Sequence, residues 1–147
     1  MQNYFSKNIY DVLTKKEELS LFLLAVKVAR LERLLQTEYP ITVLAPSNSA
    51  LSECRTKVEN LGIENGNSEK AKFLVLNHII PGEFASLDLL NFHTVKTLGG
   101  EELDIYYNFS NGDDPEIYVN NALLKEKDIK CLNGYLHLID KNYIYRF

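Results

Sequence analysis

Cysteine is scarce in this chain, and positive charge is not in excess. Its two cysteines, Cys54 and Cys131, are too few for a disulfide scaffold, and neither stands in a Cys-X-X-Cys pair. We expect two buried thiols in preference to a bridge between them. The 16 basic residues are outnumbered by 20 acidic ones, which gives a net charge of -4. That balance argues against nucleic acid as a partner, because no basic excess exists to neutralise phosphates.

Long apolar runs are also missing. The stretch from Leu19 to Ala29 is apolar apart from Ser20 and Lys27, but about eleven residues are too few to span a bilayer core. We therefore expect no transmembrane segment. The opening residues carry no apolar run after a basic start, so no signal peptide is visible. Either the protein is made without one, or the chain was cut to its mature or domain form.

The residues that are present indicate a packed globule. The 147 residues fit one domain, which we place at 1–147. Hydrophobic residues make up 46% of the chain, with nine Tyr and seven Phe, and this composition argues against disorder.

Helices are expected in the first two thirds of the chain, where apolar residues recur at helical spacing. One helix is predicted over 9–16, with Asn8 as its cap, and a second over about 18–36. Further helix starts are predicted at Ser47 or Asn48, at Ser68 and at Ser86.

Strands are expected mainly in the last third. An early strand over 41–45 is β-branched and apolar, and is predicted to be buried on both faces. From His93 onward the pattern has a period of two, and Gly99-Gly100 and Asn133-Gly134 are typical of tight hairpin turns. Helices followed by strands indicate an α+β fold, not alternating βαβ units.

Several segments, taken in order, resemble the fasciclin-like adhesion domain. ITVLAPSNSAL at 41–51 resembles the family's first signature, and LNHIIPGEF at 76–84 resembles its central Tyr-His region. The segments at 97–106 and 117–144 resemble its long C-terminal signature, and NIYDVLTKKEELSLFLLAV resembles its opening helices. The ordered set covers almost the whole chain.

This resemblance implies a fold and a function. The expected fold is an α+β β-sandwich or wedge of about seven strands, with several helices packed around the N-terminal part. The expected function is that of a non-catalytic adhesion or recognition module, extracellular or at a cell surface, which binds a protein or glycan partner. We expect no catalytic residues, no cofactor and no metal.

The resemblance also implies candidate partner-binding residues. In animal members the Tyr-His region is implicated in integrin binding, and here Asn77 precedes His78 in place of the tyrosine. The missing aromatic ring weakens the expectation of integrin binding. A second adhesion motif in animal members contains Asp-Ile, which Asp128-Ile129 matches. The candidate contacts are therefore Asn77, His78, Asp128 and Ile129.

The histidines have a structural and a chemical interpretation. For His78 we favour a buried ring that bonds to backbone over a ligand contact or a metal ligand. His137 lies between Leu136 and Leu138 and points away from their face, so we expect either a cross-strand structural role or exposure to solvent. No pair among the histidines and cysteines has the short spacing of a structural zinc site.

Other polar groups also favour structural interpretations. Ser47 lacks a surrounding Gly-X-Ser-X-Gly elbow, so N-capping is preferred to a nucleophile. Asp113, Asp114 and Glu116 lack the spacing of an EF-hand loop and are predicted to form a solvated acidic loop. Tyr106, Tyr107 and Tyr118 form either a contact patch or the cover of a sheet; the sequence leaves both open.

Two alternatives to adhesion remain. One is an intracellular or periplasmic protein that binds a small ligand or regulates another protein. The other is a hydrolase that uses a histidine with a carboxylate, for which the sequence offers no assembled motif.

Overall fold

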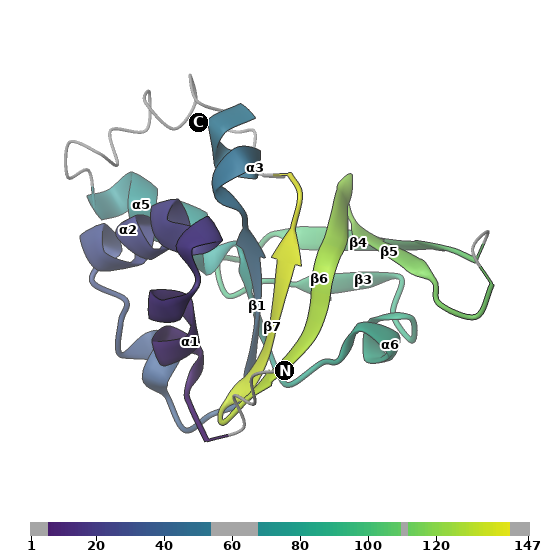
Figure 1. Ribbon diagram of the computed structural model, residues 1–147, viewed down its shortest axis with the longest axis horizontal. Coiled ribbons are helices and arrows are strands. Elements are labelled where there is room, and N and C mark those ends of the chain that lie inside the picture. Colours follow the sequence, from purple (N-terminus) through teal and green to yellow (C-terminus); the bar gives the residue numbers. More distant parts are fainter. Residues whose placement is uncertain (1–5, 54–67, 110–111, 142–147) are drawn as a thin grey trace.

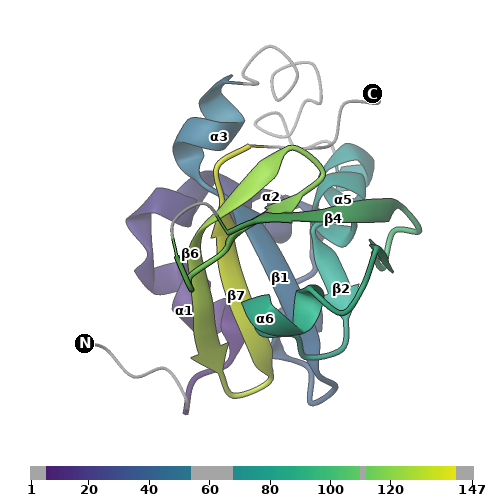
Figure 2. The same cartoon turned by 90° about the vertical axis from the view of Figure 1, so that its right-hand side faces the viewer.

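The computed structural model describes residues 6–53, 68–109 and 112–141. Helices α1, α2 and α5 lie on one side of the two central strands β1 and β7, while the short helix α6 lies on the other side (Figures 1 and 2). None of the helices in these ranges is long and apolar enough to cross a membrane.

The helices follow local signals in the sequence. They are α1 (Ile9–Lys15), α2 (Ser20–Ala29), α3 (Asn48–Glu53), α5 (Ser68–Leu76) and α6 (Ser86–Leu89), with 3-10 turns η1 (Glu17–Leu19) and η2 (Leu34–Gln36). The Asn8 side chain accepts a hydrogen bond from the Asp11 N–H at 2.9 Å, which confirms the predicted cap of α1.

Two helix predictions were wrong in detail. The second helix ends at Ala29, because Arg30 adopts a left-handed conformation with φ of 59°. The N–H groups of Arg30 and Leu31 then bond back to Lys27 and Val26, which satisfies the last carbonyls of the helix. Ser86 does not cap α6 but is its first residue; Ala85 stands at the cap position.

The strands form one seven-stranded mixed sheet. They are β1 (Ile41–Pro46), β2 (Ile79–Pro81), β3 (Thr94–Lys96), β4 (Glu102–Asn108), β5 (Glu116–Val119), β6 (Ala122–Cys131) and β7 (Gly134–Ile139). Their order is β2-β1-β7-β6-β5-β4-β3, with β1 and β7 parallel and every other neighbouring pair antiparallel. The predicted α+β class with about seven strands is confirmed.

The sheet curls until its two ends meet, so it is nearly barrel-shaped. The Leu98 N–H, just beyond β3, donates to the Ile79 carbonyl of β2 at 2.9 Å, and the Gly99 N–H donates to the Leu76 carbonyl at 3.2 Å. These two backbone hydrogen bonds join the β3 end of the sheet to the β2 end.

The two predicted hairpins exist, but one turn lies a residue earlier than predicted. Cys131 pairs with Gly134, so the turn consists of Leu132 and Asn133. Gly134 is needed for another reason: a Cβ there would stand 1.7 Å from the Ile41 carbonyl oxygen. The glycine therefore lets β7 lie directly against β1.

The core lies between the helices and the sheet. All six residues of β1 are buried, which confirms the prediction that this strand is covered on both faces. From the helical side, α1 and α2 contribute a stripe of fully or almost fully buried side chains: Ile9, Val12, Leu13, Phe22, Ala25, Val26 and Ala29. Burial of apolar surface at about 25 cal/mol per Å² makes this stripe the main reason that the helices stay on the sheet.

Candidate functional site

Asn77 lies at the junction where the two ends of the sheet meet. Its side chain is fully buried, and Oδ1 accepts a hydrogen bond from the Thr97 hydroxyl at 2.7 Å. The Asn77 Nδ2 donates to the Phe73 carbonyl at 2.9 Å. Gly99 packs so closely on this amide that a Cβ would stand 2.2 Å from Oδ1. Asn77 therefore fixes the turn between β3 and β4.

His78 is buried next to it. Its Nδ1 donates to the Leu74 carbonyl at 2.7 Å, and the Phe22 ring packs edge-on at 6.0 Å between centroids. Burial lowers the pKa of His78 to about 4, because a charged ring loses its hydration there. The ring is therefore neutral at physiological pH, and the preferred structural interpretation is confirmed.

Asp128 and Ile129 lie in β6, where the register with β7 shifts between Glu126 and Ile129. Asp128 has φ of 66°, a left-handed conformation that Asp and Asn adopt more readily than most residues. Because of this bulge, Asp128 is exposed while Ile129 packs partly against the core. Of the four candidate contacts, these two reach the surface.

The Asp128 carboxylate holds the start of α6. Its Oδ1 accepts from the Ser86 N–H and its Oδ2 from the Ser86 hydroxyl, each at 2.6 Å. A carboxylate at the N-terminal turn of a helix accepts from N–H groups that have no partner within the helix. The bulge in β6 thus connects the sheet to α6.

His137, fully buried on β7, completes this cluster. Its Nδ1 accepts from the Asp128 N–H and its Nε2 donates to the Phe84 carbonyl, both at 2.9 Å. The Tyr135 ring stacks parallel to it, at 5.9 Å. Burial lowers the pKa of His137, and the Phe84 carbonyl and Asp128 charge oppose this effect only in part. Of the two predicted roles, the cross-strand structural one is confirmed and exposure to solvent is wrong.

A hydroxyl, a carboxylate and an imidazole therefore meet at this place, but their connectivity is not that of a nucleophilic triad. In such a triad the ring nitrogen accepts the serine proton and the carboxylate orients the ring. Here Ser86 donates to Asp128, and both ring nitrogens of His137 bond to backbone groups. The ring has no lone pair directed at the hydroxyl, so the arrangement is a structural link.

The other predicted polar groups also serve the fold. The Ser47 hydroxyl accepts from the Ala50 N–H at 3.2 Å and caps α3. The Asn48 amide bonds to Leu21, Glu17 and Ser20, which holds α3 against the start of α2. Cys131 is a free, buried thiol; Cys54 lies outside the described residues. Within the described ranges no three His, Cys, Asp or Glu side chains gather as a metal site would require.

One structural residue was missed by the sequence analysis. The Asn133 amide accepts from the Ile9 N–H and donates to the Leu35 and Thr37 carbonyls, all at 3.0 Å. The sequence analysis interpreted Asn133 only as part of a turn, because the Asn-Gly pattern predicts a hairpin but not hydrogen-bond partners some 100 residues away.

A comparison with known protein families identifies the family of this chain. The family model described as the fasciclin domain matches residues 17–143, which is most of the chain. The chain belongs to the fasciclin domain family.

Relatives of this fasciclin domain occur in bacteria and animals. "Protein sll1483" of a Synechocystis strain is 31% identical over 134 residues, covering 90% of this chain and 71% of the relative. Human periostin is 26% identical over 137 residues, covering 92% of this chain but only 16% of periostin.

A solved structure has the same fold. A FAS1 domain pair from the insect cell adhesion molecule Fasciclin I superposes with a TM-score of 0.79 at 16% identity. The match covers 97% of this chain and 52% of that one, so the chain spans about half of the solved pair.

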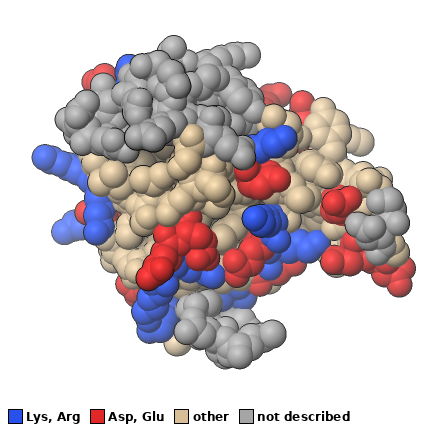
Figure 3. All heavy atoms as spheres, turned by 45° about the horizontal axis from the view of Figure 1, so that its top comes forward, with Lys and Arg blue, Asp and Glu red and all other residues tan. Residues whose placement is uncertain are grey.

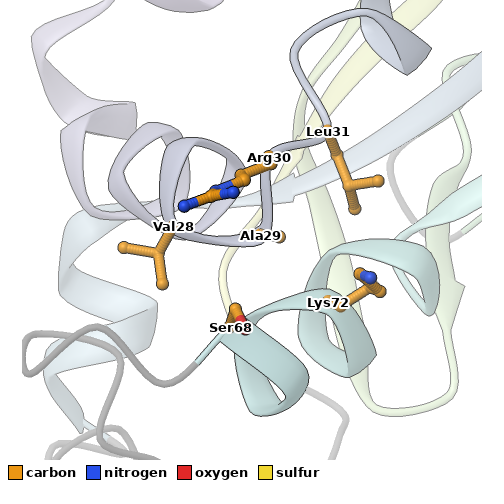
Figure 4. Close-up of a pocket in the computed structure, with 6 residues that line it drawn as sticks. All are labelled: Val28, Ala29, Arg30, Leu31, Ser68 and Lys72. Atoms are coloured by element: carbon orange, nitrogen blue, oxygen red, sulfur yellow. The ribbon is translucent and has the colours of Figure 1, made fainter.

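The fasciclin domain also has a hollow between α2 and α5. Val28, Ala29, Arg30 and Leu31 line it from the end of α2, and Ser68 and Lys72 face them from α5 (Figure 4). Its volume is about 470 Å³. Two of its lining side chains are cations, so its chemistry suits a small anion.

Proposed function

We propose that this fasciclin domain, taken as a single unit over 1–147, is a non-catalytic recognition module that binds a protein or glycan outside the cell or at its surface. The observation that carries the proposal is the connectivity around His137. The imidazole, carboxylate and hydroxyl that meet there are engaged in holding β6, β7 and α6 together. In this cluster the chain therefore presents shape and surface instead of a reactive group.

The candidate contacts act in two ways under this proposal. Asp128 and Ile129 touch the partner directly, next to the ion pair of Lys130 with Glu83. Asn77 and His78 are buried, so they act indirectly, by holding neighbouring residues in place. Asn77, for example, holds the turn that presents Leu98, which is 40% exposed.

The adhesion of beads that are densely coated with the chain tests this proposal. Beads that carry many copies of the chain are passed over immobilised glycans and extracellular proteins, and the soluble chain is run in parallel. We expect retention of the beads and weak binding of the soluble chain, because many weak contacts add up on a bead.

The contact residues are tested in the same assay with Asp128→Asn, which preserves an oxygen for Ser86 but removes the charge. The control is Glu69→Gln on α5, an exposed acid on another element. Retention should fall for the first variant only. If no surface retains the beads, in an assay that would detect millimolar affinities, the recognition function is refuted. Equal retention of both variants would refute the Asp128 contact.

The hollow between α2 and α5 favours a second candidate, the binding of a small anionic ligand. Titration calorimetry with phosphate and with di- and tricarboxylates tests it, using Arg30→Asn as the variant because Asn tolerates the left-handed conformation. Arg33→Gln, outside the lining, is the control. Binding that only the first substitution abolishes would favour this function over adhesion.

A further inference from the structure

The strands β4 and β5 form an arm that extends away from the core (Figure 1). Leu103 and Ile105, in its first part, are buried, but the tyrosines beyond them are not: Tyr106 is 55% exposed and Tyr107 57%. A large aromatic ring that stays in water keeps the unfavourable free energy of hydration that burial would remove. Exposed aromatics that gather on one element are typical of contact surfaces.

One face of the arm combines tyrosines with carboxylates. Successive side chains of a strand point to opposite faces, so Asp104 and Tyr106 share a face of β4. The pairing of Tyr106 with Tyr118 and of Asn108 with Glu116 places two residues of β5 on the same face. We call Asp104, Tyr106, Glu116 and Tyr118 the acidic tyrosine face.

The outer edge of β4 is open along the same part of the arm. The strand β3 pairs with β4 only as far as Asp104, and the last backbone hydrogen bond runs from the Ile105 N–H to the His93 carbonyl. The N–H and carbonyl of Tyr107 point to that edge two residues further on, where no strand lies within the described part of the chain. Such an edge can accept an added strand.

Charge determines what can be added. No Lys or Arg occurs between residues 97 and 124, a stretch that contains Glu101, Glu102, Asp104, Asp113, Asp114 and Glu116. In Figure 3 the charged side chains at the far end of the arm are acidic. Lys127 pairs with Asp114, and Lys96 lies opposite Glu102, but no ion pair among the described residues involves Asp104 or Glu116.

A second copy of the chain is a poor occupant of this edge, because two acidic arms side by side repel each other. A cationic segment is a good one. Its ammonium or guanidinium groups lie over the tyrosine rings and between the carboxylates, and each of these arrangements is favourable.

We propose that the acidic tyrosine face binds an extended, arginine- or lysine-rich segment of a partner protein, which pairs with the open edge of β4. This proposal rests on the recognition function proposed above and gives the chemical class of one partner.

The test is the binding of a fluorescent octapeptide of alternating Arg and Ser, with capped ends, to the full chain. Its counterpart has citrulline in place of Arg, which preserves the shape and removes the charge. The double variant Asp104→Asn, Glu116→Gln is compared with Glu38→Gln, Glu69→Gln, which changes the net charge equally on helical and loop surfaces elsewhere. All four acids lie outside the core, and thermal unfolding checks that every variant folds.

We expect the first double variant to weaken binding of the Arg peptide about tenfold, and Tyr106→Leu to weaken it about threefold. The control double variant shows whether the loss of affinity comes from the acidic tyrosine face or from net charge. The citrulline peptide shows whether binding needs the cation. Equal losses in the two double variants would reduce the effect to net charge, and strong binding of the citrulline peptide would remove the role of the cation; either result overturns the proposal.

Two further results would overturn it as well. One is absence of binding at millimolar peptide, and the other is a dimer in sedimentation that Tyr106→Leu abolishes, since the edge would then be a self-association site. If the beads of the adhesion assay are retained while the peptide does not bind, only the proposal that the arm binds a cationic segment is refuted. If neither binds, the recognition function is refuted too.

Discussion

Substitution of Gly134 by alanine should destabilise the domain far more than the same substitution at Gly100. The added methyl group would stand 1.7 Å from the Ile41 carbonyl oxygen and 2.8 Å from its carbon. Both are backbone atoms of a strand buried on both faces, so no side chain can swing away to make room. The central strands β1 and β7 would have to separate at this end.

The cost follows from the contacts that depend on this approach. The Ile41 N–H donates to the Asn133 carbonyl at 3.1 Å, and the Asn133 amide makes three further hydrogen bonds, to Ile9, Leu35 and Thr37. With about 1 kcal/mol for each hydrogen bond, the loss is about 4 kcal/mol. A domain of this size has a free energy of unfolding of about 5–15 kcal/mol, so the variant would be marginal.

Urea unfolding followed by circular dichroism measures the effect, and Gly100→Ala is the matched control. Gly100 has φ of 93°, and no heavy atom lies within 4 Å of the position that a Cβ would take, so alanine there carries only backbone strain of about 1–2 kcal/mol. If Gly134→Ala loses no more stability than Gly100→Ala, the close approach of the two strands is not what requires the glycine.

Three further predictions concern the buried groups. As the pH is lowered from 6.5 to 5, the free energy of unfolding should fall by about 1.6 kcal/mol in total for His78, because its folded pKa of about 4 lies below the unfolded value and the proton is taken up mainly by the unfolded ring. Urea midpoints that stay constant over this range would contradict it. Asp128→Asn should cost about 1 kcal/mol and Asp128→Ala about 1–2 kcal/mol more, since alanine also loses the tolerance of a positive φ; equal thermal unfolding of the two variants would argue against a strained bulge. In a Cys54→Ser background, Cys131 should resist a thiol reagent at pH 8 until urea is added, because burial raises its pKa to about 11; rapid labelling of the folded chain would show the thiol to be accessible.

The sequence predicted elements that depend on neighbouring residues. The cap at Asn8, the buried strand that begins at Ile41 and the hairpin around Gly100 each follow from residue types a few positions apart, and each is present. The end of α2 was missed, because Arg30 is not a residue that usually adopts a left-handed conformation.

The candidate site depended on distant contacts, and here the sequence was less informative. It singled out Asp128 from a dipeptide match, but not the link from Asp128 to Ser86, 42 positions away in the chain. Nor did the spacing of polar residues indicate that Thr97 bonds to Asn77. Such pairs form only once elements that are far apart in the chain have packed together, and no short sequence pattern encodes that packing.

The place of β7 in the sheet has a consequence for how the chain acquires its structure. Among the strands that the structure describes it comes last in the chain, yet it stands between β1 and β6 and joins the β2-β1 pair to the other four in the strand order. During synthesis, the edge of β1 that pairs with β7 therefore waits for its partner strand until nearly the whole domain has been made. Such distant pairing slows folding and leaves apolar strand edges open to association meanwhile, so we expect a nascent chain that stops before Gly134 to need a chaperone.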